Sequence, residues 1–455
     1  MLEGYLKFVR RFLPSPFSIA IILSIITFVV VLFYAVYAQQ KASVTEVLNW
    51  WQAGLFTPSL LVFAVQMMLM LVLGHILALT PISDRIIQTI TKHCDTTPKA
   101  AAIVAFSTLC VGLFNWGLGL IFGAILARKV GEKAVLAQQK INYPLVAAAG
   151  YAALMIWHGG LSGSALIKAA EPGHLAQLTN NSIAHLPDQI GLSLTVFSGM
   201  NLFATIGILL LVPMALYFLG KNTQEQIPEI TVEKPNGRFD QTAFLLGAEK
   251  LDNSPWFLKS IGFSILAFLV FQMFSEYASP LDFFTPNNIN LLLFSLCLSS
   301  HQNMNSLLTA TDQAIVGAGG ILLQFPLYFG IMGLMRESGL VAEISQFFVL
   351  ISNEQTFPLF TYLSAGLVNI FVPSGGGQWA IQGPILIQSS TELGVSLPKS
   401  ILALAYGDQI TNMLQPFWAL PLLGITKLSA RDILPFTLVM FLVGFMVYGL
   451  ALILF

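Results

Sequence analysis

The stretch Val372-Pro-Ser-Gly-Gly-Gly-Gln-Trp379 interrupts a long apolar run with one proline and three consecutive glycines. About 255 residues earlier, a second charge-free and glycine-rich break, Trp116-Gly-Leu-Gly-Leu-Ile-Phe-Gly123, interrupts another apolar run. Irregular backbone at membrane depth is tolerated only where it is buried in protein or lines a cavity. Interruptions at matching positions of two halves point to a substrate site. The pattern therefore predicts a membrane transporter.

A second break follows each of these breaks at nearly the same distance. Tyr151 comes 36 residues after Asn115, and Tyr406 comes 37 residues after Asn369, so the two copies keep register to within one residue. The second breaks are Trp157-His-Gly-Gly-Leu-Ser-Gly-Ser164 and Gly407-Asp-Gln-Ile-Thr-Asn-Met-Leu-Gln-Pro416. The spacing predicts two structurally related halves.

The composition is typical of a protein that lies in the lipid bilayer. Hydrophobic residues make up 56% of the 455 residues and charged residues 9%, with a mean hydropathy of +0.76. This composition leaves too little polar surface for a soluble fold, so we expect an all-α polytopic membrane protein. The net charge of -1 offers no basic surface to nucleic acid, and we expect no nucleic-acid partner.

Several classes of function lack their sequence signatures. The chain has no Gly-x-x-x-x-Gly-Lys-Ser/Thr loop for ATP and no Gly-x-Ser-x-Gly elbow of a hydrolase. Cys94, Cys110 and Cys297 form neither a metal-ligand pattern nor a disulfide framework. We therefore expect no enzymatic activity, no metal site and no cofactor beyond a coupling ion, H+ or Na+.

The distribution of basic residues predicts the orientation of the chain. Short loops rich in Lys and Arg face the cytoplasm, which assigns there the N-terminus and residues 80–99, 128–140 and 220–255. Residues 100–127 lie between two of these loops but number only 28, too few for two spans of about 20 residues each. A re-entrant hairpin with its tip at 115–119 resolves the conflict. By alternation, a second hairpin over 357–387 enters from the outside.

These assignments predict two inverted repeats, each with two spans, a re-entrant hairpin, a broken transmembrane helix and a final span. The first repeat covers residues 1–219 and the second 281–455, joined by a cytoplasmic linker at 220–255 and a linker transmembrane helix at 256–280. The result is about nine crossings plus two hairpins, with a cytoplasmic N-terminus.

The hairpin tips and breaks can bind a small anion. Each exposes backbone amides, and the N-terminus of a half-helix carries about half a positive charge. Residues 100–127, 145–167 and 357–387 contain no Lys or Arg, so the site suits a single carboxylate better than a multiply charged substrate. Close helix packing by small residues is the alternative explanation of the glycines. The candidate substrate-binding residues are Asn115, Ser162, Ser164, Asn369, Ser374, Gly375, Gly376, Gly377 and Gln378.

Asp408 is the leading candidate for ion coupling. It is the only acidic residue between Lys399 and Lys427, in a segment that must cross the membrane. A central carboxylate there costs about 2.5 to 3.5 kcal/mol on insertion scales, which usually indicates function. A structural pair with a residue elsewhere is the alternative. Asn412, Gln415 and His158, which lies at the matching break of the first half, complete the candidate ion-coupling set.

Several of these motifs resemble the bacterial short-chain fatty acid transporter family. The similarity includes the runs Phe371 to Pro384, Ala405 to Pro421, Phe114 to Leu120, Gly160 to Ser164 and Gln324 to Tyr328, and so extends over nearly the whole chain. The resemblance implies a place in an ion-transporter superfamily of inverted repeats with two hairpins. It also implies a homodimer with scaffold and moving transport domains.

The resemblance implies uptake of short-chain fatty acids, such as butyrate or acetoacetate, across the bacterial inner membrane. Together with the breaks and Asp408, it predicts a secondary active transporter of a small monocarboxylate, coupled to H+ or Na+. Three alternatives remain open: an ion-coupled transporter of another small carboxylate, a Na+/H+ antiporter, and a passive channel. Asp408 alone serves an antiporter poorly, because no second buried carboxylate is evident, and a passive channel leaves the paired breaks unexplained.

Overall fold

The computed structural model describes residues 15–37, 43–80, 89–179, 183, 186–232, 247–276, 283 and 285–455. Helices dominate these ranges, which hold no β-strand and one isolated bridge, between Ile141 and Gln226. The helices of the first half are α2 (Pro16–Tyr37), α3 (Val44–Leu55), α4 (Pro58–Ala78), α6 (Thr97–Phe114), α7 (Trp116–Leu136), α8 (Tyr143–Ala149), η1 (Ala152–Met155), η2 (Trp157–Gly159), α9 (Ser164–Ala169), α10 (His174–Leu178), η3 (Leu192–Leu194) and α11 (Gly199–Gly220).

The linker region and the second half contribute the remaining described helices. They are α12 (Glu249–Asp252), α13 (Pro255–Ser275), α14 (Pro286–Ser300), α15 (Met304–Ile315), η4 (Val316–Ala318), α16 (Gly319–Glu337), α17 (Leu340–Leu350), α18 (Phe357–Phe371), α19 (Gly375–Glu392), α20 (Leu397–Thr411), η5 (Asn412–Leu414), α21 (Leu420–Thr426) and α22 (Ala430–Leu454). The chain is therefore an all-α protein, as the composition predicts.

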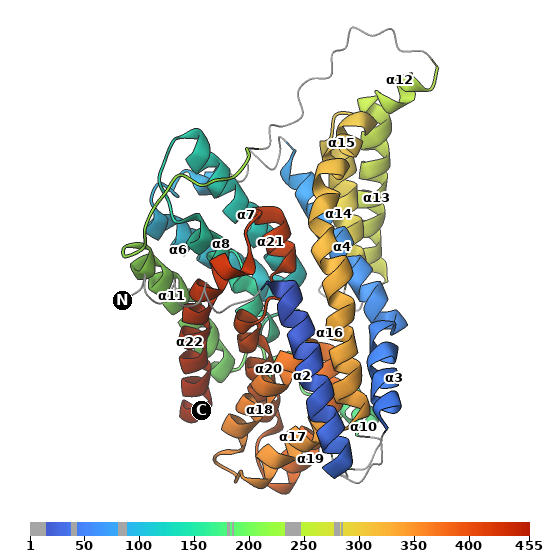
Figure 1. The fold of residues 1–455 in the computed structure, drawn as a ribbon, viewed down its shortest axis with the longest axis vertical. Helices are drawn as coiled ribbons and strands as arrows, with labels where there is room; N and C mark the ends of the chain where they lie inside the picture. The colour runs from blue at the N-terminus through green and yellow to red at the C-terminus, as the bar shows by residue number, and fades with distance from the viewer. Residues whose placement is uncertain are drawn as a thin grey trace.

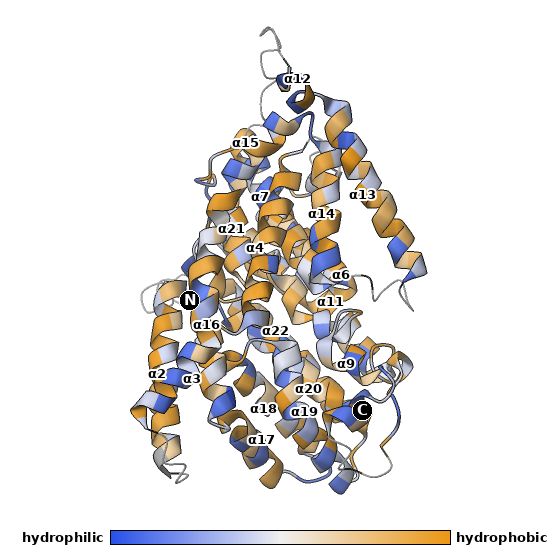
Figure 2. Ribbon diagram, turned by 90° about the vertical axis from the view of Figure 1, so that its right-hand side faces the viewer, coloured by the Kyte–Doolittle hydropathy of each residue, from blue (hydrophilic) through white to orange (hydrophobic). Residues whose placement is uncertain are grey.

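Long apolar helices form the outside of the molecule. In the described ranges, six helical stretches are long and apolar enough to cross a membrane, and the bent pair α15 and α16 brings the number to seven. Only 17% of the span window is buried in α2 and in α13, so most of their side chains face outward. Figure 2 shows hydrophobic residues along most of the length of these helices. The protein is thus a multi-pass membrane protein.

The predicted nine crossings correspond to a particular subset of these helices. One of the six apolar stretches is α6, which is a hairpin arm in the predicted topology. The count of nine leaves out α6, keeps the other five stretches and the bent pair, and adds α14 and the two broken segments, residues 143–169 and 397–426. The helices of these three additions are too short to qualify by length. The number of crossings and the inverted relation of the halves stay predictions.

The first hairpin turns at a single residue. Asn115 has an extended backbone (φ -152°) between α6 and α7, and its Oδ1 accepts a hydrogen bond from the Leu118 amide (3.0 Å) as the N-cap of α7. The two arms run antiparallel, because a Cβ on Gly119 would lie 2.8 Å from the Gly112 Cα. The break predicted at 115–119 is therefore confined to Asn115, and the following glycines are helical.

The second hairpin turns at residues 372–374. Ser374 has an extended backbone and is the N-cap of α19, with its Oγ accepting from the Gly377 amide (3.3 Å). Pro373 has no N–H that an extension of α18 would require. The three consecutive glycines therefore form the first turn of α19 rather than a loop.

Both predicted broken segments are broken. After α8 the chain passes through the short 3₁₀ helices η1 and η2 before α9 begins, and α20 ends in η5 before α21 begins. Glycine lets these segments lie close to their neighbours: a Cβ on Gly407 would stand 2.1 Å from the Tyr362 carbonyl oxygen of α18. All residues of α20 from Ser400 to Thr411 are buried. The broken segments are therefore the core of the protein.

The helices form two groups (Figure 1). The long helices α4, α13, α14 and α15 lie side by side on one side of the molecule, and α2 and α3 pack on α16. The hairpins and broken helices gather on the other side, where α6, α7, α8 and α21 lie above α18 and α19 in this view and α22 lies beside α20. This arrangement brings the second hairpin against the first broken segment.

Candidate functional site

The tip of the second hairpin contacts the break of the first half. A Cβ on Gly375 would lie 2.6 Å from both Cε1 and Nε2 of His158 and 3.1 Å from the Ser164 Oγ. Only glycine fits this approach without displacing the imidazole. Two segments more than 200 residues apart in the sequence, both predicted from their interruptions, therefore meet at Gly375.

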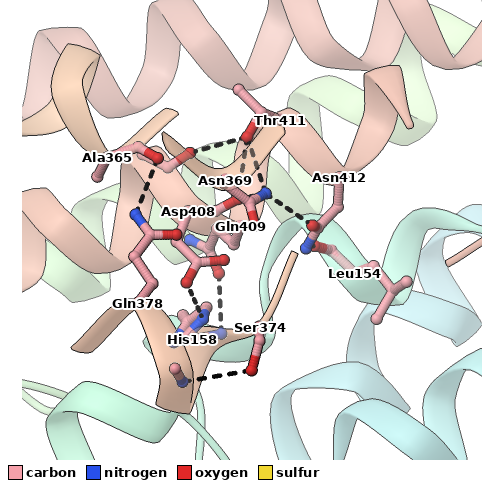
Figure 3. Close-up of polar contacts among 12 residues, drawn as sticks. Leu154, His158, Ala365, Asn369, Ser374, Gln378, Asp408, Gln409, Thr411 and Asn412 are labelled. Carbon is pink, nitrogen blue, oxygen red and sulfur yellow. Dashed lines mark hydrogen bonds and ion pairs between the residues drawn. The ribbon is translucent and has the colours of Figure 1, made fainter. Parts of the chain in front are cut away.

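His158 and Asp408 form a buried pair at this contact (Figure 3). The His158 Nε2 lies 3.2 Å from the Asp408 Oδ2, and their side chains are 0% and 2% exposed. The backbone amide of His158 donates to the Oε1 of the neighbouring Gln409 (2.9 Å). Since an isolated buried charge is strongly disfavoured, each of these two side chains is the neighbour that can offset a charge on the other.

Asn369 connects the second hairpin to α20. Its Nδ2 lies within 2.9 Å of the Asp408 carbonyl oxygen, the Thr411 Oγ1 and the Asn412 Oδ1. The sequence pattern places Asn369 at the hairpin tip, whereas the structure places it in the last turn of α18, before Ser374 caps the next helix. The side chain thus positions Asp408 through its backbone.

Asn412 and Gln415 lie in the same network but not along one helix face. Asn412 belongs to η5 and donates through Nδ2 to the Leu154 carbonyl oxygen (3.2 Å). Gln415 is extended and donates through Nε2 to the Asn369 carbonyl oxygen (2.9 Å). The end of α20 at Thr411 explains the difference from the expected helical spacing.

Three side-chain amide oxygens around this network have no hydrogen-bond partner among the described residues. They are Asn369 Oδ1, Gln378 Oε1 and Gln415 Oε1. In each case the amide nitrogen donates to another oxygen, and the Gln378 Nε2 lies 2.9 Å from the Ala365 carbonyl oxygen and 2.7 Å from the Gln382 Oε1. Because buried polar atoms are normally satisfied, these oxygens are candidates to accept from a ligand or to bind a cation.

The N-terminus of α19 offers a position for an anion. Ser374 accepts from the Gly377 amide through its Oγ and from the Gln378 amide through its carbonyl oxygen. The amides of Gly375 and Gly376 are the first of the helix and have no intrahelical acceptor. A Cβ on Gly376 would meet nothing within 4 Å, so this end of the helix faces open space. The helix dipole makes the position favourable for negative charge.

The tip of the first hairpin is bonded to the first broken segment. The Ser162 Oγ accepts from the Trp116 amide (3.0 Å), and Asn115 caps Leu118. The Leu161 amide donates to the Leu113 carbonyl oxygen (2.8 Å). Ser162 and Asn115 therefore hold the first hairpin to the first broken segment, while Ser164 lies beside Gly375 and His158.

Gln409 and Trp157 are the neighbours of the pair that sequence reasoning missed. Gln409 anchors the His158 amide, and the Trp157 ring centroid lies 3.7 Å from that of His158. The signal for Gln409 in the sequence is its position, since it is a polar residue directly after Asp408 in an apolar segment. No group of three His, Cys, Asp or Glu side chains with metal-binding geometry occurs in the described ranges.

A loop helix packs against the second hairpin. The Trp379 Nε1 on α19 donates to the His174 Nε2 on α10 (3.0 Å), so the imidazole must accept at that nitrogen and be neutral. Burial lowers the pKa of His174; Glu171 opposes this shift and Lys168 adds to it. Protonation would replace the acceptor with a second donor and break the bond.

Comparisons with known proteins agree over almost the entire chain. The sequence model of the family described as short chain fatty acid transporter matches residues 2–455. A relative from Escherichia coli (strain K12), with the provisional name short-chain fatty acid transporter, is 34% identical over 452 residues, covering 99% of this chain and 98% of the relative.

A second relative and one solved structure cover similar shares. The relative from Haemophilus influenzae (strain ATCC 51907 / DSM 11121 / KW20 / Rd) has the same provisional name and is 34% identical over 438 residues, covering 94% of this chain and 93% of its own. The crystal structure of the Alcanivorax borkumensis YdaH transporter aligns with a TM-score of 0.42 and 16% identity, covering 96% of this chain and 98% of that chain.

The contact between His174 and Trp379 predicts a loss of stability in acid. Because the folded pKa is lowered, the stabilisation is complete above the unfolded value of about 6.5 and is lost as the pH falls below that value and through the folded pKa. His174→Gln keeps an acceptor that does not titrate. The melting temperature of the wild type should therefore fall more than that of the variant between neutral and mildly acidic pH. An equal fall in both proteins would contradict the prediction.

Proposed function

This chain belongs to the short-chain fatty acid transporter family, and we propose that it carries short-chain monocarboxylates such as butyrate and acetoacetate, driven by an ion gradient. As a member of that family it is a transporter and not an enzyme. The observation that carries the proposal is the buried His158–Asp408 pair, which lies against the open N-terminus of α19. We place the protein in the bacterial inner membrane with its N-terminus in the cytoplasm.

The charge of the pair explains how a proton and a carboxylate can bind together. With one proton the pair is neutral, and with two it carries one positive charge. A carboxylate at the Gly375 and Gly376 amides compensates that charge, and the attraction is strong at low dielectric. Without a substrate, the second proton leaves an unpaired buried charge, which is disfavoured. One proton and one carboxylate then cross together without net charge.

The absence of basic side chains limits the substrate to a single negative charge. Residues 145–167 and 357–387 contain neither Lys nor Arg. The helix N-terminus supplies about half a positive charge and a doubly protonated pair supplies one more. A second carboxylate on the same substrate would have no partner here, so a monocarboxylate suits the site better than a dicarboxylate.

Sodium coupling is the second candidate mechanism. The unpartnered oxygens of Asn369, Gln378 and Gln415 are neutral oxygen donors, the type of ligand that hard cations take in proteins. A sodium ion at these oxygens would also offset the charge of an arriving carboxylate. The site is therefore compatible with coupling to H+ or to Na+. The ion whose gradient drives uptake distinguishes the two.

We also propose that residues 1–219 and 281–455 are inverted repeats that expose the site alternately to the two sides. Two features support the correspondence. The pairs α3 with α4 and α15 with α16 both begin with a capping box, at Ser43 and at Asn303, and each breaks after a first helix of 12 residues. Each half also has a hairpin followed by a broken helix. In such transporters the site lies where the repeats meet.

The inverted topology predicts that the hairpin tips are reached from opposite faces. Single cysteines at Gly117 and Gly376, in a background without Cys94, Cys110 and Cys297, should react with membrane-impermeant thiol reagents from the cytoplasmic and the outer face respectively. Gly376 should react faster, since it faces open space whereas Gly117 contacts Met70. Labelling of both positions from the same face would refute the inverted arrangement.

Transport by the purified protein tests the function itself. Proteoliposomes should accumulate radiolabelled acetoacetate and butyrate under an inward proton gradient, above the level of protein-free liposomes. Asp408→Asn and His158→Gln should each lose gradient-driven accumulation, because neither retains the titratable pair. Asp95→Asn removes an exposed carboxylate paired with Lys99 and should transport as the wild type does.

The driving gradient decides between the candidates. Accumulation that needs a sodium gradient and survives His158→Gln would favour the amide-oxygen site. Ion exchange with no carboxylate uptake under any gradient would replace the proposal with the antiporter. Equal accumulation by the wild type and Asp408→Asn would make Asp408 a structural residue.

A further inference from the structure

A cluster of aromatic rings adjoins the His158–Asp408 pair. Its members come from α4, the first hairpin tip, η2, α16 and the segment that leads into α21. We call this group the aromatic cluster: Phe63, Trp116, Trp157, Phe325, Phe417 and Trp418. None of these side chains carries a charge, and together they join helices from both groups of the fold.

The cluster begins at His158. The Trp157 centroid lies 3.7 Å from the His158 ring, and Trp116 lies 5.9 Å from Trp157. Trp116 then contacts Trp418 at 5.3 Å in an edge-to-face arrangement. A ligand whose charged end lies at the pair therefore has a continuous aromatic wall beside it.

Phe63 contacts three other rings of the cluster. Its ring lies 6.3 Å from Trp116, 6.2 Å from Phe325 and 5.9 Å from Trp418. Phe63 and Trp116 are half-buried, whereas Phe325 is 0% exposed. The cluster thus has an accessible flank at Phe63 and Trp116 and a closed base at Phe325.

The hydrogen-bond network beside the pair is polar. Asn369, Gln378 and Gln415 present amide oxygens without partners, and an acyl chain against them would leave those oxygens unsatisfied. The faces of the aromatic rings have no such requirement and gain from contact with methylene groups. The chain of a bound fatty acid is therefore directed toward the rings.

Two polar atoms next to the rings also lack partners. The Trp157 Nε1 and the Tyr328 hydroxyl are buried and have no hydrogen-bond partner in the described part of the chain. The Tyr328 ring contacts Phe417 at 4.8 Å. Both atoms are N–H or O–H donors, which suits an acid that carries an additional oxygen on its chain.

We propose that the aromatic cluster is the acyl-chain subsite and that Phe63 sets the longest chain accepted. The proposal rests on the carboxylate transport proposed above. A smaller side chain at position 63 opens the flank to longer acids, and a larger one closes it to butyrate.

Binding of acids of increasing length tests the subsite directly. Dissociation constants for acetate, butyrate and hexanoate are measured by calorimetry on the purified full-length protein, for the wild type, Phe63→Ala and Phe63→Trp. In Phe63→Ala the affinity for hexanoate relative to butyrate should rise about tenfold, the factor expected for burying two more methylene groups. In Phe63→Trp the affinity for butyrate relative to acetate should fall.

Phe441→Ala is the matched control. Phe441 is also half-buried and packs on a phenylalanine, Phe445, with ring centroids 5.6 Å apart, but it lies on α22. Its ratio of affinities should equal that of the wild type. Should Phe63→Ala fail to fold, Phe63→Leu should shift the ratio in the same direction by a smaller factor.

The possible results distinguish a failure of the proposed subsite from a failure of the proposed function. The subsite alone is refuted if the wild type binds butyrate but neither Phe63 variant changes the relative affinities for acids of different length. A ratio that shifts as much in Phe441→Ala as in Phe63→Ala also refutes it, because the effect would then be general. A wild type that binds no fatty acid refutes the proposed function and the subsite together.

Discussion

Asp408 lies on a helix segment in which every residue from Ser400 to Thr411 is buried, so only the protein can compensate its charge. His158 supplies that compensation from the other half of the chain, at 3.2 Å. The requirement for this partner ties the first broken segment to the second. Gly375 has to be glycine because the hairpin tip packs on the same imidazole, and Asn369 fixes the backbone of Asp408 from the adjoining helix.

The breaks in the helices provide backbone amides that an uninterrupted helix does not offer to a ligand. A continuous helix satisfies its own amides, whereas the start of α19 leaves the Gly375 and Gly376 amides for a ligand. At the first hairpin the first amide of the helix, that of Trp116, is bonded instead to the Ser162 Oγ. The two tips therefore differ in role in this structure: the second is open beside the titratable pair, and the first is closed and presents Trp116 to the aromatic cluster.

Much of this arrangement is predictable from the sequence, for physical reasons. Hydropathy and the spacing of the interruptions predict helices, hairpins and broken segments, because backbone geometry at Pro373 or Asn115 is a local property. The isolated Asp408 and His158 are recognisable because charge in an apolar segment is costly. Their direct pairing depends on packing between the halves, which no local pattern contains. The same holds for Gln409, for the position of Asn369 within α18, and for the end of α20 before Gln415.

We propose that the His158–Asp408 pair takes up one proton when one carboxylate binds. The most direct test is to add acetoacetate to the detergent-purified protein in weakly buffered solution and to follow the pH with an indicator dye. We expect uptake of one proton for each bound acetoacetate in the wild type and none in His158→Gln, because the remaining Asp408 carboxyl, neutral with its single proton, has no place for a second. Binding of acetoacetate by the wild type without proton uptake would contradict it.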